Sequence, residues 1–326
     1  MNTSKLILFR ASGSDEIGTG HIRRCRAISL EASRKGWNTV LVVDWGQVEW
    51  AQNKFVAEEF TRIVDPDTAL NDYPASRIVI LDSYILNDTD PIFRIKTQKT
   101  FSITDVDAPK YQNVVEIFQG FPIKRFRPEA KSGILGPIVS SEFHDIHQSP
   151  FRRESRSVIQ IVITAGGNDG TNFCQELCEL LADINKPMKV ICMTRQELIS
   201  LDERFSQIAP GPILMEKLKV ADLVFSTAGT TVWELLVAGI PFGHGLAYDN
   251  QRGNYESLTS RKLGVPIGVF ENDSWKFDRR AINSLVSSNL YRRRSRLRIA
   301  INYKPILISN LFSKIENEIN EGNKSL

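Results

Sequence analysis

The sequence predicts an α/β protein made of two doubly wound domains, and three observations support this. Its 326 residues exceed what one hydrophobic core usually serves. Short apolar runs rich in Val, Ile and Leu are typical of strands buried on both faces of a parallel sheet. Helical stretches follow these runs in both halves. Glycine, proline and polar residues crowd positions 120–157, so we place the domains at 1–150 and 151–326.

Four strands are expected in the first half. Leu6–Phe9, Val40–Val43, Ile78–Leu81 and Thr100–Ile103 are short and lack polar alternation. After the first of them, apolar residues recur at helical spacing between 22 and 32. This order of strand, turn and helix opens a doubly wound unit.

The second half repeats the pattern. Strands are expected at Val158–Thr164, Met188–Met193 and Leu223–Ser226, and helices at Thr230–Ala238 and Asn250–Lys262. A further strand or loop begins at 241, and the last 35 residues have helical apolar spacing from 307 to 315. We therefore expect a C-terminal helix as part of the second domain.

Composition restricts the function classes. Net charge is +3, which is too balanced to favour nucleic acid as a partner. No apolar run reaches 18 residues and no signal peptide is visible, so we expect a cytoplasmic chain without stable membrane insertion. The four cysteines form no C-x-x-C pair or zinc pattern and are expected as small core residues.

The first glycine turn lies between the first strand and its helix. Gly18 and Gly20 let a ligand approach the backbone, and His21 follows in the first helical turn. A helix N-terminus attracts anions and favours a neutral, proton-accepting histidine. His21 is either a catalytic base or a structural residue of that turn. A nicotinamide site is disfavoured because Arg23 stands where a third glycine is needed.

A second glycine turn follows the strand that ends at residue 164. Gly166 and Gly167 can present backbone N–H groups to a phosphate without a lysine or a metal. No Walker pattern accompanies them. The alternative is an ordinary strand-to-helix turn capped by Asp169 or Thr171.

The third turn is the most specific feature of the second half. Its strand ends in small residues, Ala228 and Gly229, and hydroxyl residues start the next helix. The helix N-terminus with Thr230 and Thr231 can bind a diphosphate. Glu234, one turn later, can accept hydrogen bonds from both hydroxyls of a ribose, or it is a plain surface residue of the helix.

Three blocks resemble the UDP-sugar hydrolases of pseudaminic acid biosynthesis in order and spacing. They are the stretch 8–24 with its Gly-Thr-Gly-His, the pair Gly166-Gly167, and 228–234 followed by Asp249-Asn250-Gln251. The similarity extends over about residues 5–270. It implies the GT-B fold, in which two Rossmann-like domains face each other across a cleft and the C-terminal one holds UDP.

The resemblance also implies roles for single residues. His21 corresponds to the catalytic histidine, Tyr84 to the tyrosine of an Asp-His-Tyr segment, and Asn250 to the asparagine of an Asn-Gln segment that ends in Gln251. Glu234 corresponds to the ribose-binding glutamate. No metal or other cofactor is implied, the partner is a nucleotide sugar, and a monomer is expected.

The implied reaction is inverting hydrolysis at the anomeric carbon of a UDP-linked 2,4-diacetamido-2,4,6-trideoxyhexose. His21 takes a proton from the attacking water, and UDP leaves. One alternative is a glycosyltransferase of the same fold, in which His21 deprotonates an acceptor hydroxyl. Another is a nucleotide-sugar-binding protein without catalysis, because Ser83 stands where the family usually has histidine.

Other polar groups are assigned no chemistry. Asp105 and Asp107 have no further ligand at metal spacing and fit a loop. His144 and His147 fit a solvated linker, and His244 follows an expected strand close to the site. The basic run from 292 to 298 is either a solvated helix face or a contact for an anionic surface.

Overall fold

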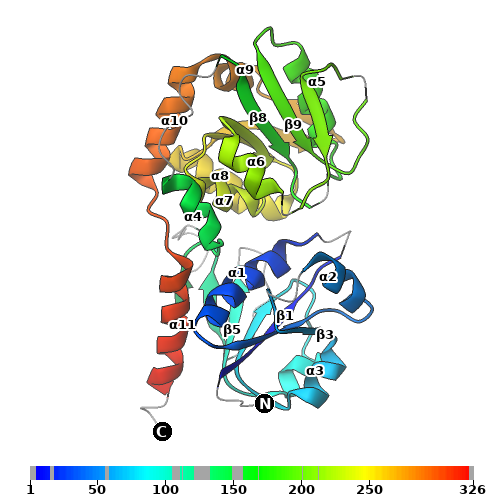
Figure 1. The fold of residues 1–326 in the computed structure, drawn as a ribbon, viewed down its shortest axis with the longest axis vertical. Coiled ribbons are helices and arrows are strands. Elements are labelled where there is room, and N and C mark those ends of the chain that lie inside the picture. Colours follow the sequence, from blue (N-terminus) through cyan, green and yellow to red (C-terminus); the bar gives the residue numbers. More distant parts are fainter. Residues whose placement is uncertain are drawn as a thin grey trace. The chain divides into compact units, whose positions relative to one another are not determined.

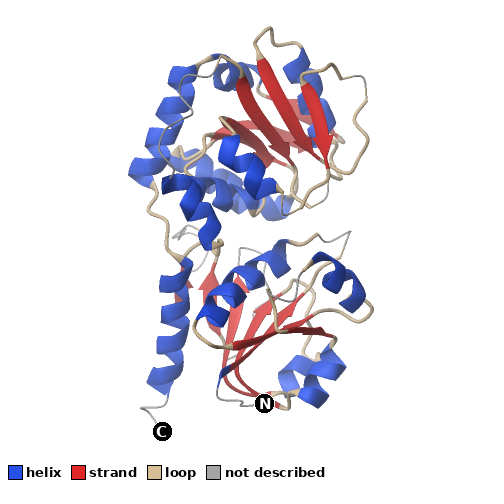
Figure 2. Ribbon diagram, viewed as in Figure 1, coloured by secondary structure: helices blue, strands red, loops and turns tan. Residues whose placement is uncertain are grey.

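The computed structural model describes residues 5–14, 18–55, 59–104, 111, 113–120, 133–148, 157–167, 169–199, 201–211 and 213–322. Asp105 and Asp107 lie outside this set. The chain forms two units, one of Met1–Ser140 with Ile306–Leu326 and the other of Ser141–Pro305. Each has a twisted sheet with helices packed on it (Figures 1 and 2).

Unit 1 contains a parallel sheet in the order β3-β2-β1-β4-β5-β6-β7. Chain order runs outward from β1 in one direction to β3 and then resumes beside β1 with β4, which defines a doubly wound sheet. The strands are β1 (Leu6–Ala11), β2 (Asn38–Val42), β3 (Arg62–Val64), β4 (Ala75–Asp82), β5 (Lys96–Thr104), β6 (Val115–Phe118) and β7 (Gly133–Leu135).

Helices cover both faces of this sheet, because its strands carry apolar side chains on both. Ile7 and Phe9 of β1 belong to one buried cluster, whereas Leu6 and Leu8 belong to another on the opposite face. The helical elements of this region are α1 (Gly20–Arg34), α2 (Val48–Lys54), α3 (Pro66–Asp72) and the short 3₁₀ helix η2 (Pro91–Arg94).

The C-terminal helix α11 (Ile308–Gly322) also belongs to unit 1. Its buried residues Leu311, Phe312 and Ile315 join the apolar cluster that contains Ile22 and Phe9. Placing this helix in the second domain was therefore wrong, since its apolar stripe covers the first sheet. The division after 150 also needs correction, because α4 (Ser141–Gln148) falls in unit 2 and packs on its helices.

Unit 2 repeats the architecture with the strand order β10-β9-β8-β11-β12-β13-β14. All neighbours are parallel except the final antiparallel pair of β13 and β14. The strands are β8 (Ile159–Thr164), β9 (Met188–Met193), β10 (Phe205–Ile208), β11 (Leu223–Thr227), β12 (Phe242–Leu246), β13 (Val265–Glu271) and β14 (Ser274–Phe277).

A buried cluster joins one face of this sheet to its helices. It includes Ile161 and Phe225 from the strands, and Leu177 and Leu285 from α5 and α9. All four cysteines of the chain are buried and free, as their spacing predicted. The helical elements are α5 (Phe173–Ala182), α6 (Leu214–Val220), α7 (Thr231–Ala238), η3 (Asp249–Gln251), α8 (Arg252–Arg261), α9 (Arg279–Ser287) and α10 (Asn289–Asn302).

None of the described helices combines the length and the apolar character needed to cross a bilayer.

Candidate functional site

Each sheet has one point where the direction of winding reverses. In unit 1 it lies between β1 and β4, and in unit 2 between β8 and β11. Ligands of doubly wound proteins bind outside the carboxyl ends of the strands at such a point. The three glycine turns predicted from the sequence follow β1, β8 and β11. The fold therefore places each of them at a switch point of its own unit.

His21 stands in the first turn of α1 and is held by an acid at the end of β4. Its Nδ1 lies 2.7 Å from Oδ1 of Asp82, and both side chains are buried. Nδ1 has two charged neighbours, because Nη2 of Arg24 also lies 2.7 Å from it. A carboxylate only accepts and a guanidinium only donates, so the tautomer in which Nδ1 donates to Asp82 is the one that leaves Nε2 as a proton acceptor. An acid that orients a histidine in this way is a recurring arrangement for a general base.

Arg24 completes this group one helical turn after His21. Its Nε and Nη2 donate to the two carboxylate oxygens of Asp82, at 2.8 and 2.5 Å. The pair is buried and its charges cancel. Because Arg24 binds both oxygens in a fixed geometry, it holds the carboxylate that orients His21.

The turn that leads into α1 depends on glycine. Gly18 has φ of +85°, which favours glycine, and its N–H donates to the carbonyl of Ser14 at 2.8 Å. Gly20 is the first residue of α1, and Thr19 provides no side-chain cap.

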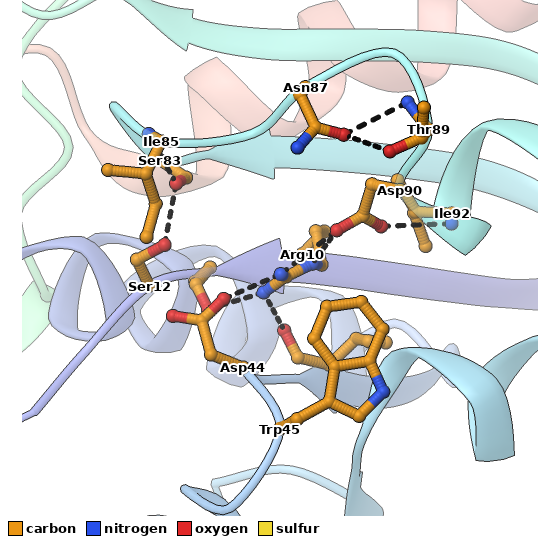
Figure 3. Close-up of polar contacts among 12 residues, drawn as sticks. Arg10, Ser12, Asp44, Trp45, Ser83, Ile85, Asn87, Thr89, Asp90 and Ile92 are labelled. Carbon is orange, nitrogen blue, oxygen red and sulfur yellow. Dashed lines mark hydrogen bonds and ion pairs between the residues drawn. The ribbon is translucent and has the colours of Figure 1, made fainter.

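Tyr84 lies against His21, and a role for Tyr84 toward a substrate stays a prediction. The two rings meet edge to face with centroids 4.6 Å apart, and Tyr84 is 37% exposed. Ser83, where the resemblance led us to expect a histidine, is buried. Its hydroxyl lies 2.5 Å from that of Ser12 and accepts a hydrogen bond from the backbone N–H of Ile85 (Figure 3). Ser83 thus links the loops after β1 and β4.

A buried arginine ties further loops to the same edge of the sheet (Figure 3). Arg10 of β1 donates to Asp44, which follows β2, at 2.6 Å, and to Asp90, which precedes η2, at 3.0 and 3.1 Å. Arg10 is 1% exposed. Asp90 also accepts from the backbone N–H of Ile92 at 3.0 Å. The network fixes two loops, the one after β2 and the one before η2, to β1.

In unit 2 the turn after β8 is capped by its own acid. Asp169 accepts hydrogen bonds from the backbone N–H groups of Phe173 and Cys174, both at 2.8 Å. Gly166 has φ of +92°, and a side chain there would meet no atom within 4 Å. Gly167 follows it in the same turn. The capping alternative for Asp169 is confirmed, whereas phosphate binding at Gly166 and Gly167 stays a prediction.

The turn after β11 differs, because α7 begins without a side-chain cap at Thr230. Asn254 of α8 fixes the backbone of this turn, because its Nδ2 donates a hydrogen bond to the carbonyl of Ala228 at 3.0 Å. Thr231 starts the helix, and Glu234 lies half-buried in its first turn. The N–H groups of Val232 and Trp233 donate to the backbone carbonyls of Gly229 and Thr230 at 3.4 and 3.1 Å. A helix N-terminus without a side-chain cap at its N-cap residue suits an anionic ligand.

The segment after β12 lies beside this turn. Oε1 of Gln251 accepts from the backbone N–H of Ala247 at 3.4 Å, and its Nε2 is 3.6 Å from where a Cβ at Gly229 would stand. Asn250 is exposed on the 3₁₀ helix η3. Gln251 therefore lies at the α7 turn, and a role for Asn250 toward a ligand stays a prediction.

His244 of β12 is a buried structural residue. It is 0% exposed, and its Nε2 lies 3.3 Å from the hydroxyl of Thr259, which donates to the carbonyl of Tyr255. Burial lowers the pKa of His244 to about 3. The ring is therefore neutral in the folded protein, and its complete burial separates it from any ligand.

This burial predicts a loss of stability in acid. Below the ordinary pKa of 6.5 the unfolded chain binds a proton that folded His244 does not, so unit 2 loses stability as the pH falls from 6.5 toward 3. The expected loss is about 1.4 kcal/mol per pH unit, or about 2 kcal/mol at pH 5. Urea unfolding of the wild type and of His244→Gln at pH 7 and pH 5 measures it. An equal pH dependence in both proteins contradicts the assignment.

Three positioning residues were missed by the sequence interpretation. Asp82, Arg24 and Asn254 each act on a predicted site residue from another part of the chain or from the next helical turn. The acid at the end of a buried strand was a usable signal for Asp82, because an unpaired carboxylate is costly there. The positions of Arg24 and Asn254 carried no comparable signal.

The chain has the GT-B fold of two Rossmann-like α/β domains. No known family model and no curated protein sequence matches it. Among solved structures it is similar to MurG of Acinetobacter baumannii, with a TM-score of 0.62 and 12% identity over 97% of this chain and 99% of that one. Arabidopsis thaliana UGT89C1 complexed with UDP-L-rhamnose gives 0.65 and 10% identity over 97% and 98%. The calicheamicin glycosyltransferase CalG4 gives 0.60 and 14% over 99% and 98%. At such identities the likeness establishes the fold.

Proposed function

We propose that this protein is an enzyme that uses a UDP-sugar and activates a nucleophile with His21. The observation that carries the proposal is the His21–Asp82 pair, buried and oriented at the switch point of unit 1. A histidine with its Nδ1 proton fixed by a carboxylate has Nε2 available to take a proton.

We assign binding of the nucleotide part of the substrate to unit 2. The uncapped N-terminus of α7 suits the diphosphate, with Thr230 and Thr231 as hydroxyl donors. Glu234 is assigned the ribose hydroxyls, and Gly166 and Gly167 present backbone at the neighbouring turn. Two solved structures of the same fold, both of UGT89C1, contain UDP or UDP-L-rhamnose, which supports a UDP-sugar as the substrate.

The favoured reaction is transfer of the sugar to an acceptor hydroxyl. Nε2 of His21 takes the proton of the acceptor, whose oxygen bonds to the anomeric carbon. The carbon–oxygen bond to the diphosphate breaks, and its electron pair leaves with UDP. The N-terminal dipole of α7 stabilises the charge that grows on the leaving group. Solved structures of similar fold that are glycosyltransferases, CalG4 and SnogD among them, support this candidate.

Hydrolysis is the second candidate, and the Gly-Thr-Gly-His block at 18–21 favours it through its resemblance to the pseudaminic acid hydrolases. Water then replaces the acceptor, and the substrate is a UDP-linked 2,4-diacetamido-2,4,6-trideoxyhexose. Incubation with this UDP-sugar and no acceptor separates the candidates. Rapid stoichiometric release of UDP indicates hydrolysis, and release only after an acceptor is added indicates transfer.

The nucleotide assignment predicts the effect of Glu234→Ala. Removing a charged acceptor of ribose hydroxyls weakens UDP binding by about 10- to 100-fold. Titration calorimetry with UDP measures this change. Glu216→Ala is the matched control, because Glu216 lies in the first turn of the neighbouring helix α6 and is exposed. Equal UDP affinity of Glu234→Ala and the wild type removes the ribose assignment.

A further inference from the structure

The C-terminal part of the chain has a strong local excess of positive charge. Residues 279–315 contain no aspartate or glutamate. The same stretch carries basic residues at Arg279, Arg280, Arg292, Arg293, Arg294, Arg296, Arg298, Lys304 and Lys314. Most of them lie on α10 (Figure 1). A whole-chain net charge of +3 hides this concentration.

One side of α10 is anchored to unit 2. Ser295 and Ile299 are buried, and the hydroxyl of Ser288 caps the helix by accepting from the N–H of Tyr291 at 3.1 Å. Arg292 donates to the last carbonyls of α9, at Leu285 and Val286, both at 2.7 Å. These contacts fix α10 on α9, and the side of α10 that carries Ser295 and Ile299 faces the protein.

That opposite side combines aliphatic and basic residues. Leu290, Leu297 and Ile301 are 57%, 57% and 73% exposed. They stand seven and four residues apart and so lie along one stripe of the helix. Arg294 and Arg298 are exposed beside the stripe. A solvated helix face does not need three large aliphatic side chains in line.

We propose that this face of α10, formed by Leu290, Arg294, Leu297, Arg298 and Ile301, docks on an anionic membrane surface. Arginines attract anionic lipid headgroups, and aliphatic side chains between them enter the acyl boundary. With 14 residues, α10 is too short to span a bilayer and lies in the interfacial plane.

Two other occupants fit the face less well. A nucleic acid would pair with the arginines but leaves the three aliphatic side chains without a partner. A second copy of the chain would cover the stripe but brings two sets of arginines together without a carboxylate from the same segment. Of these three occupants, an anionic lipid surface is the one that matches both kinds of side chain.

Vesicle cosedimentation tests the proposal with the full chain. The wild type is expected to bind vesicles of equimolar phosphatidylglycerol and phosphatidylcholine, and not vesicles of phosphatidylcholine alone. Arg294→Gln with Arg298→Gln lowers the partition coefficient by about 25-fold, at about fivefold for each arginine. Leu297→Ser with Ile301→Ser lowers it by about tenfold.

Matched controls come from other exposed positions of unit 2. Lys186→Gln with Lys189→Gln removes two positive charges elsewhere, and Ile199→Ser removes an isoleucine that is 68% exposed. Both controls are expected to bind as the wild type does. UDP binding by every variant stays at the wild-type level, so failure of docking and failure of the proposed enzymatic function are distinguishable.

Substitution of the two aliphatic residues Leu297 and Ile301 distinguishes a lipid surface from a nucleic acid as the ligand of this face. Poly(U) RNA serves as the polyanion probe, and the Leu297→Ser/Ile301→Ser variant is expected to bind vesicles about tenfold more weakly while its RNA binding stays unchanged. Absence of wild-type binding to anionic vesicles overturns the proposal. So does vesicle binding that the serine pair leaves intact, because charge alone then accounts for it.

Discussion

Replacing His21 by asparagine is expected to lower UDP release from a UDP-sugar by about 10²–10⁴-fold, the range that general-base catalysis contributes. The affinity for UDP stays unchanged, because the nucleotide is assigned to the α7 turn of unit 2. Asparagine retains a polar side chain beside Asp82 but has no nitrogen that can take a proton. Asp82→Asn is expected to act in the same direction, since the amide that replaces the carboxylate can donate to Nδ1 and so favour the other tautomer of the ring.

Steady-state turnover and calorimetry together make this test specific. His144→Asn is the control, because His144 is another buried histidine; the expectation of a solvated linker was wrong for it, since it lies on α4. Its turnover should equal that of the wild type. Full turnover of His21→Asn disproves the base assignment, and a parallel loss of UDP affinity indicates a structural role for His21 instead.

Replacing Arg10 by methionine is expected to destabilise unit 1 by about 3–5 kcal/mol. Arg10 is 1% exposed and binds Asp44 and Asp90. Methionine fills part of the volume but leaves two carboxylates without their cation, and Asp90 is itself buried. The cost is that of an uncompensated buried charge.

Urea unfolding of unit 1 measures this change, with Arg62→Met as its control. Arg62 also binds an aspartate, Asp72 at 2.6 Å, but the two side chains are 50% and 40% exposed. Such an exposed pair contributes about 0–1 kcal/mol. Equal destabilisation by the two substitutions contradicts the assignment of Arg10 as the buried centre of a network.

The buried strands were predictable from the sequence, because short unbroken runs of Val, Ile and Leu are typical of strands that are covered on both faces. The expected strand at 188–193 matches β9, and that at 223–226 differs from β11 by one residue. Shorter or more polar strands were missed. β10 has mostly exposed or half-exposed residues, and β3 has only three residues, so neither gives a clear periodic signal.

The C-terminal helix shows a different limit. Its apolar spacing predicted a packed face correctly, and Leu311, Phe312 and Ile315 are fully buried. Spacing alone does not say which sheet that face covers. Lys35 and Trp37 of unit 1 bind Glu316, and these contacts join residues about 280 positions apart. Such long-range partners leave no mark in local sequence patterns.

The sequence predicted the glycine turns of the candidate site but not the contacts that support its residues. Gly18 and Gly166 have the positive φ angles that strand-to-helix turns favour, and His21 lies in the first turn of its helix. Asp82 reaches His21 across 61 positions of sequence, so only the parallel pairing of β1 with β4 reveals the pair.

The most direct measurement of the central claim is UDP release from a panel of UDP-sugars, with the wild type and His21→Asn assayed side by side. The panel includes the 2,4-diacetamido-2,4,6-trideoxy altrose derivative, and each sugar is assayed with and without hydroxyl acceptors. We expect stoichiometric UDP release from at least one sugar by the wild type and its loss in His21→Asn. Release at equal rates by both proteins, or no release from any sugar under either condition, contradicts the assignment of His21 as the base of a UDP-sugar enzyme.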